Sequence, residues 1–254
     1  MIYGGKNCSK TTTALSVTLL PTALHPEPTI DAPNEYTVAC LSFDLQTNRI
    51  KKEIYKNNPN IVVFDPLFYR TKETDQDNLD SATKTYNYVR WLLTEGPIYQ
   101  MKPHFILIDG LEIFKEVFEM AMKQMLEIPA YGKADWTAWR KRTDLMDDID
   151  ICCKRLAKKV VIYTSYTKFR EVQEKGSNVV TLVEPNWAGN TKSKTGIVIR
   201  VEMTKNDSGG REYLASVEGS KVLSMPTTSA PQRVGYIDEH NQPQVIGIKA
   251  LGTL

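Results

Sequence analysis

The chain has 254 residues, of which 41% are hydrophobic and 24% are charged, and it contains 14 glycines and 13 prolines. This composition is typical of a globular protein and excludes a disordered, collagen-like or coiled-coil chain. Thirty-two Lys and Arg residues against 30 Asp and Glu residues leave a formal net charge of +2, too small to attract nucleic acid or an anionic membrane over the whole surface, so any nucleic-acid site would be a local patch.

Cysteines and histidines are few and form none of the common metal-binding or catalytic motifs. No CxxC, HExxH or GxSxG pattern occurs, which argues against a zinc protease and an α/β-hydrolase. Free thiols are typical of a reducing compartment, so we expect a cytoplasmic protein. No apolar run reaches the ~18 residues of a membrane span, and we expect no membrane partner. A secretory signal over residues 6–24, where two lysines precede an apolar run, is the alternative.

The chain begins with a degenerate Walker A motif. Gly4, Lys10 and Thr11 match the pattern GxxxxGK[ST], whereas Ser9 replaces its second glycine. In such a loop the backbone N–H groups and the lysine bind phosphate oxygens and the hydroxyl holds Mg²⁺, but a serine costs free energy wherever the backbone needs a positive φ. A Lys- and Thr-rich surface turn is the alternative. The residues expected to bind ATP are Gly4, Gly5, Lys6, Asn7, Cys8, Ser9, Lys10, Thr11 and Thr12.

Helical and strand-like segments then alternate along the chain. Apolar side chains spaced by three and four residues, with proline or glycine as stop signals, predict helices at residues 11–20, 79–93, 111–125 and 136–156. Short apolar runs rich in β-branched residues predict strands at residues 36–43, 60–64, 105–108 and 160–163. The alternation predicts an α/β protein with a three-layer α/β/α fold and a mainly parallel central sheet.

Asp109 directly follows the predicted strand at residues 105–108. In a parallel sheet, ligand-binding groups gather at the carboxyl ends of the strands. Asp109 is therefore the candidate Walker B aspartate, which together with Thr11 would hold Mg²⁺. A helix N-cap is its alternative role. Gly110 follows instead of a glutamate, which disfavours the ATPases that have consecutive Asp and Glu residues here.

Beyond Thr164 the pattern changes. Residues 165–194 form a long polar segment with little periodicity, which predicts an irregular segment that is either functional or mobile. Clean alternation over residues 196–204, a turn, and a return over residues 211–218 predict a β-hairpin with its strands in one sheet. We assign residues 1–224 to one core domain. The remaining residues, 225–254, are a tail with a short hairpin around residues 241–243, and the tail either packs on the core or recruits a partner.

Five segments together resemble a known family. In chain order they are IYGGKNCSKTT, CLSFDLQ, FILIDGLEIF, YGKADWTAWRKRTDLM and VVIYTSYTKF. They resemble the small RecA-like core P-loop ATPases encoded by phages and archaeal viruses, which act in recombination on single-stranded DNA, and the likeness covers residues 2–218. The resemblance implies binding of ATP and Mg²⁺, self-association through the nucleotide interface, and DNA-binding loops after the fourth core strand.

The sequence departs from this family at the residue that activates water. In RecA-like enzymes a glutamate lies two positions after the aspartate that ends a strand, but here Asp44 is followed at that position by Gln46. A glutamine orients a water molecule and cannot accept its proton. Asp44, Asp65 and Glu112 are substitutes, each of which is also explained as a cap or a surface carboxylate. Together with Ser9, this departure leaves slow hydrolysis or a purely binding role open.

Two hydroxyls end the fourth predicted strand, where related folds place a polar sensor of the γ-phosphate. They belong to Thr164 and Ser165, and exposed strand-end hydroxyls are the alternative reading. The predicted catalytic residues are Lys10, Gln46, Asp109, Thr164 and Ser165.

The segment over residues 165–194 also has the composition of a site for single-stranded DNA. Basic groups neutralise phosphates and interleaved aromatic rings stack on bases, whereas a solvated lid is the alternative. Lys205 and Arg211, beside the predicted hairpin turn, are candidate cations for a neighbouring subunit's γ-phosphate, or plain solvated charges. Trp136 and Trp139 are expected in the core. The residues expected at DNA are Tyr166, Lys168, Phe169, Arg170, Lys175, Trp187, Lys192 and Lys194.

The leading hypothesis is a RecA-type ATPase that acts on single-stranded DNA in recombination, annealing or replication. One alternative is a nucleotide-dependent binding module that does not hydrolyse ATP, which phosphate release would distinguish. Another is a different P-loop enzyme, such as a packaging motor or a small kinase. A kinase would transfer phosphate to a small molecule, whereas the leading hypothesis requires DNA binding that weakens with salt.

Overall fold

The computed structural model describes residues 1–68, 74–173, 179–186, 194–206, 209–221, 227–228 and 230–252. Its helical elements are α1 (Lys10–Leu15), η1 (Ser16–Leu19), α2 (Thr47–Glu53), α3 (Asp75–Thr94), α4 (Pro97–Met101), α5 (Leu111–Met125), α6 (Trp136–Leu156) and η3 (Ile248–Leu251). Its strands are β1 (Ile2–Gly4), β2 (Val38–Ser42), β3 (Ile61–Phe64), β4 (Phe105–Asp109), β5 (Val160–Gln173), β6 (Val179–Pro185), β7 (Ile197–Lys205), β8 (Arg211–Ser220), β9 (Gln232–Ile237) and β10 (Pro243–Val245).

The strands of the described residues form one sheet of ten strands in the order β10-β9-β8-β7-β1-β5-β4-β2-β3, with β6 paired to β5 off this path. From β7 across to β3 all neighbouring strands are parallel. The hairpins β5–β6, β7–β8 and β9–β10 and the pair β8–β9 are antiparallel. The expected α/β class with a mainly parallel sheet is therefore confirmed.

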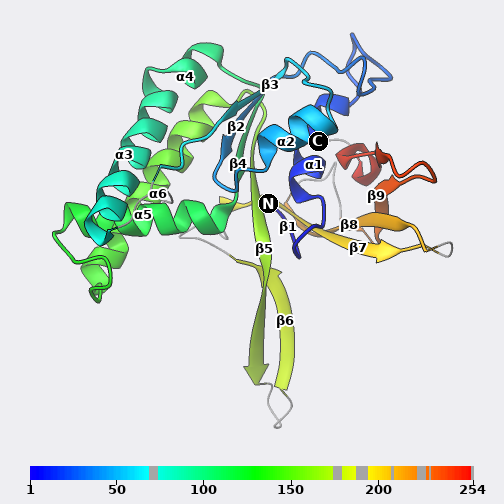
Figure 1. Ribbon diagram of the computed structural model, residues 1–254. Coiled ribbons are helices and arrows are strands. Elements are labelled where there is room, and N and C mark those ends of the chain that lie inside the picture. The colour runs from blue at the N-terminus through cyan, green and yellow to red at the C-terminus, as the bar shows by residue number, and fades with distance from the viewer. Residues whose placement is uncertain are drawn as a thin grey trace.

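Helical elements cover both faces of this sheet (Figure 1). Ile106 and Ile108 of β4 pack in a cluster with α3, α5 and α6, whereas Phe105 and Leu107 of the same strand belong to a second cluster with α1 and η1. Because both faces of β4 are buried, its sequence is a continuous apolar run and does not alternate. The arrangement is compatible with a three-layer α/β/α fold.

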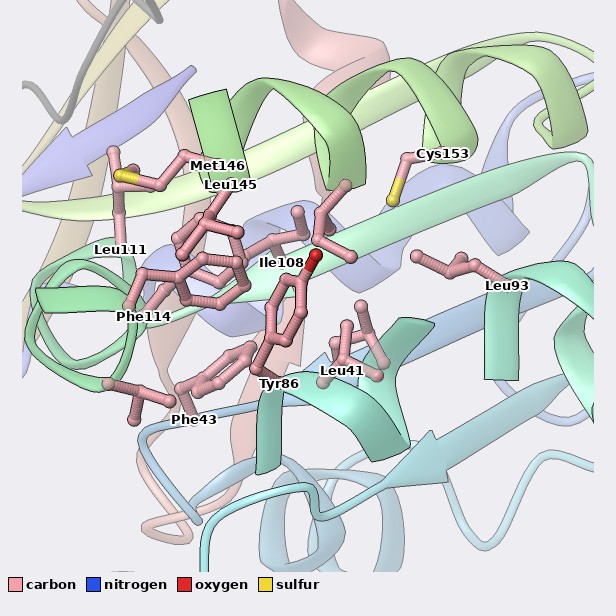
Figure 2. Close-up of a cluster of buried hydrophobic side chains, with 14 of the residues drawn as sticks. Leu41, Phe43, Tyr86, Leu93, Ile108, Leu111, Phe114, Leu145, Met146 and Cys153 are labelled. Atoms are coloured by element: carbon pink, nitrogen blue, oxygen red, sulfur yellow. The ribbon is translucent and has the colours of Figure 1, made fainter. Parts of the chain in front are cut away.

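Aromatic rings pack among aliphatic side chains in the cluster formed with α3, α5 and α6 (Figure 2). The ring of Phe43 meets that of Phe114 edge-on at 5.2 Å, and Tyr86 meets Phe118 edge-on at 5.4 Å. Such contacts add about 0.5–1.5 kcal/mol to the burial of the rings. Phe43 directly follows β2 and Phe114 lies near the start of α5, so their contact holds two segments that lead out of neighbouring strands.

The prediction that residues 165–194 form an irregular segment is wrong for the part of this segment that the structure describes. β5 continues without interruption to Gln173, and from Thr167 it pairs antiparallel with β6. The resulting hairpin, here called the arm (residues 167–173 and 179–185), extends away from the body of the molecule (Figure 1). Four consecutive β5 residues, 168–171, are exposed, so both faces of the ribbon meet solvent. A ribbon that is exposed on both faces shows no hydrophobic alternation, which is why the periodicity predicts no strand here.

At the opposite end of the sheet, both predicted hairpins are present, and part of the tail packs on the core. β7 pairs with β8 across residues 197–220, and β9 pairs with β10 around residues 237–243. β9 also pairs with β8, and Ile248 and Leu251 are buried in the cluster with α1. The backbone N–H of Ile248 donates to Ser16 Oγ at 2.8 Å. Residues 232–251 therefore pack on the core, which is one of the two roles considered for the tail.

The start of α6 differs from expectation. Asp135 caps this helix by accepting a hydrogen bond from the N–H of Ala138 at 2.8 Å, which leaves Trp136 in the first turn pointing outward with 80% of its surface exposed. The prediction that Trp136 lies in the core is therefore wrong. Trp139 is half-buried and contacts the Arg142 guanidinium at 4.5 Å from its ring centre. Among the helices of the described residues, none combines the length and the apolar character needed to cross a membrane.

Candidate functional site

The carboxyl ends of β1, β2 and β4 lie together at one edge of the sheet, beside the part of β5 around Thr164 from which the arm continues. The strands are parallel, with Ser42 beside Asp109 and Ile2 beside Thr164. Residues that follow these strands therefore converge although they are far apart in sequence, as expected for ligand sites in α/β folds.

Asp109 is the centre of this edge. Its Oδ1 accepts hydrogen bonds from the hydroxyls of Thr11 at 2.8 Å and Thr164 at 2.5 Å, and its Oδ2 accepts one from Thr47 at 2.8 Å. Burial raises the pKa of the Asp109 carboxyl, and the hydroxyl donors act in the opposite direction because they favour the charged form. The three threonines come from α1, β5 and the start of α2, so one carboxylate ties three elements together.

The segment after β2 passes so close to the backbone at position 110 that only a glycine fits there. Gly110 has a φ of +93°, and a Cβ there would lie 3.0 Å from Asp44 Cβ and 3.1 Å from Asp44 N. Its N–H donates to Thr164 Oγ1 at 3.0 Å. A side chain immediately after Asp109 would therefore strain the backbone and displace Asp44, which explains the glycine at this position.

The Walker A-like loop leaves β1 under tight constraints. A Cβ on Gly4 would lie 2.1 Å from the carbonyl oxygen of Val201 in β7, so only glycine fits there. Asn7 and Ser9 have φ values of 61° and 58°, and Ser9 makes no side-chain cap to α1. The predicted cost of Ser9 is thus present in the backbone, since a left-handed conformation is unfavourable for a residue with a Cβ. α1 has six residues before it tightens into η1, so its dipole contributes little.

Lys10 lies between the loop and Tyr166 in β5. Its Nζ donates to the carbonyl of Gly5 at 2.7 Å and lies 4.2 Å from the centre of the Tyr166 ring. Burial lowers the pKa of Lys10, while Cys8, Glu112, Asp44 and Asp109 act in the opposite direction. The ammonium group is therefore held between the loop backbone and an aromatic ring. The remaining loop residues divide by exposure: Gly5, Lys6 and Asn7 are exposed, and Cys8, Thr11 and Thr12 are buried.

A second carboxylate, Glu112, holds the base of the arm. Its Oε1 accepts hydrogen bonds from Ser165 Oγ at 2.7 Å and from the N–H of Tyr166 at 2.6 Å. The hydroxyl of Tyr166 in turn donates to Asp44 Oδ2 at 3.4 Å. Thr164, Ser165 and Tyr166 are consecutive in β5, and their side-chain hydroxyls donate to Asp109, Glu112 and Asp44, respectively.

Gln46 does not share in these contacts. Its side chain is exposed at the start of α2, and the next residue, Thr47, is the one that reaches Asp109. Thr47 is a site residue that sequence reasoning missed, and Tyr166, which was expected at DNA, lies over Lys10 and donates to Asp44. Thr47 had one available signal, because it is a hydroxyl residue close after a strand end, like Thr164.

A cleft of about 640 Å³ adjoins the loop. Gly4, Gly5, Lys6 and Cys8 line one side of it, and the other walls come from the arm and from β7 and β8. Its size falls within the ~300–1,000 Å³ of small-molecule sites.

The oxygen groups beside the loop suit a magnesium ion. Among the described residues, no group of three or more His, Cys, Asp or Glu side chains could hold a metal. Mg²⁺ in nucleotide sites needs no such group, since it takes one or two protein oxygens and completes its shell with phosphates and water. The Thr11 hydroxyl and the Asp109 carboxylate, 2.8 Å apart, are ligands of this kind. The residues present therefore fit a Mg²⁺–nucleotide.

The residues considered for DNA and for a neighbouring subunit have mixed positions. Phe169 is 69% exposed on the arm, between the exposed Lys168 and Arg170. Lys194 instead forms ion pairs with Asp147 at 2.7 Å and Asp150 at 3.5 Å on α6. Lys175, Trp187 and Lys192 lie outside the described residues. Lys205 and Arg211 face each other as the last pair of the β7–β8 ladder.

Comparison with known proteins adds no relative. The sequence matches no protein-family model and no curated protein.

Proposed function

We propose that the chain is an ATP-binding and ATP-hydrolysing RecA-like protein that acts on single-stranded DNA. The observation that carries this proposal is the 2.8 Å hydrogen bond between Thr11, next to the loop lysine, and Asp109 at the end of β4. Two motifs that are 98 residues apart in sequence meet where P-loop enzymes need a hydroxyl and a carboxylate for the metal. The degenerate loop alone, with Ser9, would be weak support.

Each residue of the edge has a role in this proposal. Lys10 binds the β- and γ-phosphates after its bond to Gly5 opens, and the loop N–H groups bind phosphate oxygens. Thr11 and Asp109 hold Mg²⁺, which when bound neutralises charge on the phosphates. Thr164, bonded to Asp109, links this pair to β5, and Ser165 orients Glu112.

The arm supports the DNA part of the proposal. It follows the fourth core strand, where the family resemblance implies DNA-binding loops. An exposed aromatic ring between two exposed cations is suited to base stacking and phosphate neutralisation, without reading sequence. Self-association through the nucleotide interface remains part of the proposal on the resemblance alone.

Calorimetry with the purified chain tests nucleotide binding. We expect the wild type to bind Mg²⁺–ATP, and the Lys10→Ala variant to lose most of that affinity because it lacks the phosphate-binding ammonium group. Lys52→Ala, which removes an exposed lysine on α2, is the matched control and should bind normally. Absence of heat with both ATP and ADP in folded wild type would refute the proposal.

One observation favours a second function, a nucleotide-dependent switch without hydrolysis. Gln46, at the position of the usual catalytic glutamate, is exposed and cannot accept a proton. Phosphate release decides between the two: a switch binds Mg²⁺–ATP and releases no phosphate above the Lys10→Ala background.

A further inference from the structure

Glu112 is built into the site more tightly than a surface carboxylate. It lies in the first turn of α5, three residues after Asp109. Two donors from β5, the Ser165 hydroxyl and the Tyr166 N–H, fix its Oε1 at 2.7 and 2.6 Å. Ser165 is almost fully buried, so this half of the carboxylate is held in place by the core of the sheet.

The other oxygen of Glu112 has no partner. Oε2 is buried, and no donor among the described residues forms a hydrogen bond with it. A buried acceptor that is left unpaired costs free energy, so such an atom calls for an explanation in the working state of the protein. The loop lysine is linked to Glu112 through Tyr166, whose N–H donates to Glu112 Oε1 at 2.6 Å and whose ring centre lies 4.2 Å from Lys10 Nζ.

The other acidic residues near the strand ends are less suited to accept a proton. Asp65 is exposed and accepts a hydrogen bond from Asn48 Nδ2 at 2.7 Å on the outer side of α2. Asp109 uses both oxygens for hydroxyls and is the metal candidate. Asp44 is half-exposed and is the remaining competitor, because its Oδ2 accepts from the hydroxyl of Tyr166, the residue whose ring covers Lys10.

We infer that Glu112 is the catalytic base of this chain and takes the place of the glutamate that Gln46 replaces. The inference rests on the proposed ATPase function. Glu112 Oε2 accepts a proton from a water molecule as the water oxygen bonds to the γ-phosphorus. The bond from that phosphorus to the β,γ-bridging oxygen breaks, and ADP leaves with the electron pair. The bound Oε1 keeps the carboxylate oriented throughout.

The Glu112→Gln variant separates the base from the scaffold. Its amide oxygen can still accept from Ser165 and Tyr166, so the arm stays attached, but no basic oxygen remains. We expect the rate of phosphate release to fall about 100-fold or more, with the affinity for Mg²⁺–ATP within about threefold of wild type. After rapid desalting, the variant should retain ATP where the wild type retains ADP, a readout independent of turnover.

Two matched variants and one conservative variant complete the experiment. Glu116→Gln removes the charge of an exposed carboxylate one turn along α5 and should hydrolyse like wild type. Asp44→Asn should lose less than about tenfold in rate. Glu112→Asp keeps the negative charge but moves the carboxylate back by one methylene group. This variant should bind nucleotide normally and turn it over much more slowly. Such a result would show that the slow turnover of Glu112→Gln does not come from the introduced amide.

The outcomes separate the inference from the proposed function. Glu112→Gln with a wild-type rate, or loss of turnover in Asp44→Asn alone, overturns the role of Glu112. Wild type that binds Mg²⁺–ATP without releasing phosphate overturns it as well, while nucleotide binding stands. Wild type that binds no nucleotide refutes the proposed function itself.

Discussion

Two β-hairpins extend from the same sheet, and they differ in almost every physical respect. The β7–β8 hairpin lies between β1 and β9 and buries Ile199, Val201 and Val217 in the core. Among the described residues, the strands of the arm pair only with each other, and one hydrogen bond from the Tyr3 hydroxyl of β1 reaches the Val183 carbonyl at 3.5 Å. The arm exposes Phe169 and Leu182. One hairpin is a part of the core, whereas the other is attached to it through the continuous strand β5.

This difference shows where the molecule is free to interact. A two-stranded ribbon is marginally stable by itself, so the arm depends on the contacts of Thr164, Ser165 and Tyr166 at its base. Large apolar side chains that remain exposed on such a ribbon contribute little to folding. They are the side chains most available to a ligand.

The largest effect is expected where the β7–β8 hairpin meets the loop. Gly4→Ala would place a Cβ 2.1 Å from the Val201 carbonyl, which cannot move without breaking the pairing of β1 with β7. We expect a loss of about 3 kcal/mol in the free energy of unfolding, measured by urea denaturation. Gly196→Ala is the control, since a Cβ there meets nothing within 4 Å. Equal stability of the two variants would contradict this account of the loop.

On the arm, the expected effect is on binding and not on stability. Phe169→Ala should weaken binding of single-stranded DNA by about 1–3 kcal/mol, the value of one stacked base, with unchanged thermal unfolding. Fluorescence anisotropy with a labelled oligonucleotide at fixed salt measures it. Tyr99→Ala removes an aromatic side chain that is 46% exposed on α4, away from the arm (Figure 1), and should leave the affinity unchanged. If both variants bind alike, the arm is not the DNA site.

The same contrast explains what the sequence could predict. A buried face produces a pattern, so the strands of the core and the β7–β8 hairpin are predictable from apolar runs and alternation. The arm has no buried face and left no pattern. Within the site, motif spacing predicts Lys10, Thr11 and Asp109 as functional residues, and in the structure the Thr11 hydroxyl donates to Asp109.

Contacts that depend on the pairing of distant strands are beyond such reasoning. Thr47 reaches Asp109 across 62 residues, and Tyr166 covers Lys10 only because β5 lies beside β1. The need for glycine at position 4 likewise arises from Val201, which belongs to the far hairpin. No local motif carries this information, because strand order decides it.

The smallest expected effect tests the comparison most directly. Leu182→Ala, on the arm, should change the free energy of unfolding by less than about 0.5 kcal/mol, since the side chain is already 45% exposed. Val217→Ala, on β8 and almost fully buried, removes fewer atoms but should cost about 2 kcal/mol, because it leaves a cavity. Urea denaturation followed by far-UV circular dichroism compares the two. A cost for Leu182→Ala as large as that for Val217→Ala would mean that the arm unfolds with the core and packs against it in solution. The arm would then be a structural element, and the exposure of its residues would no longer support a role in ligand binding.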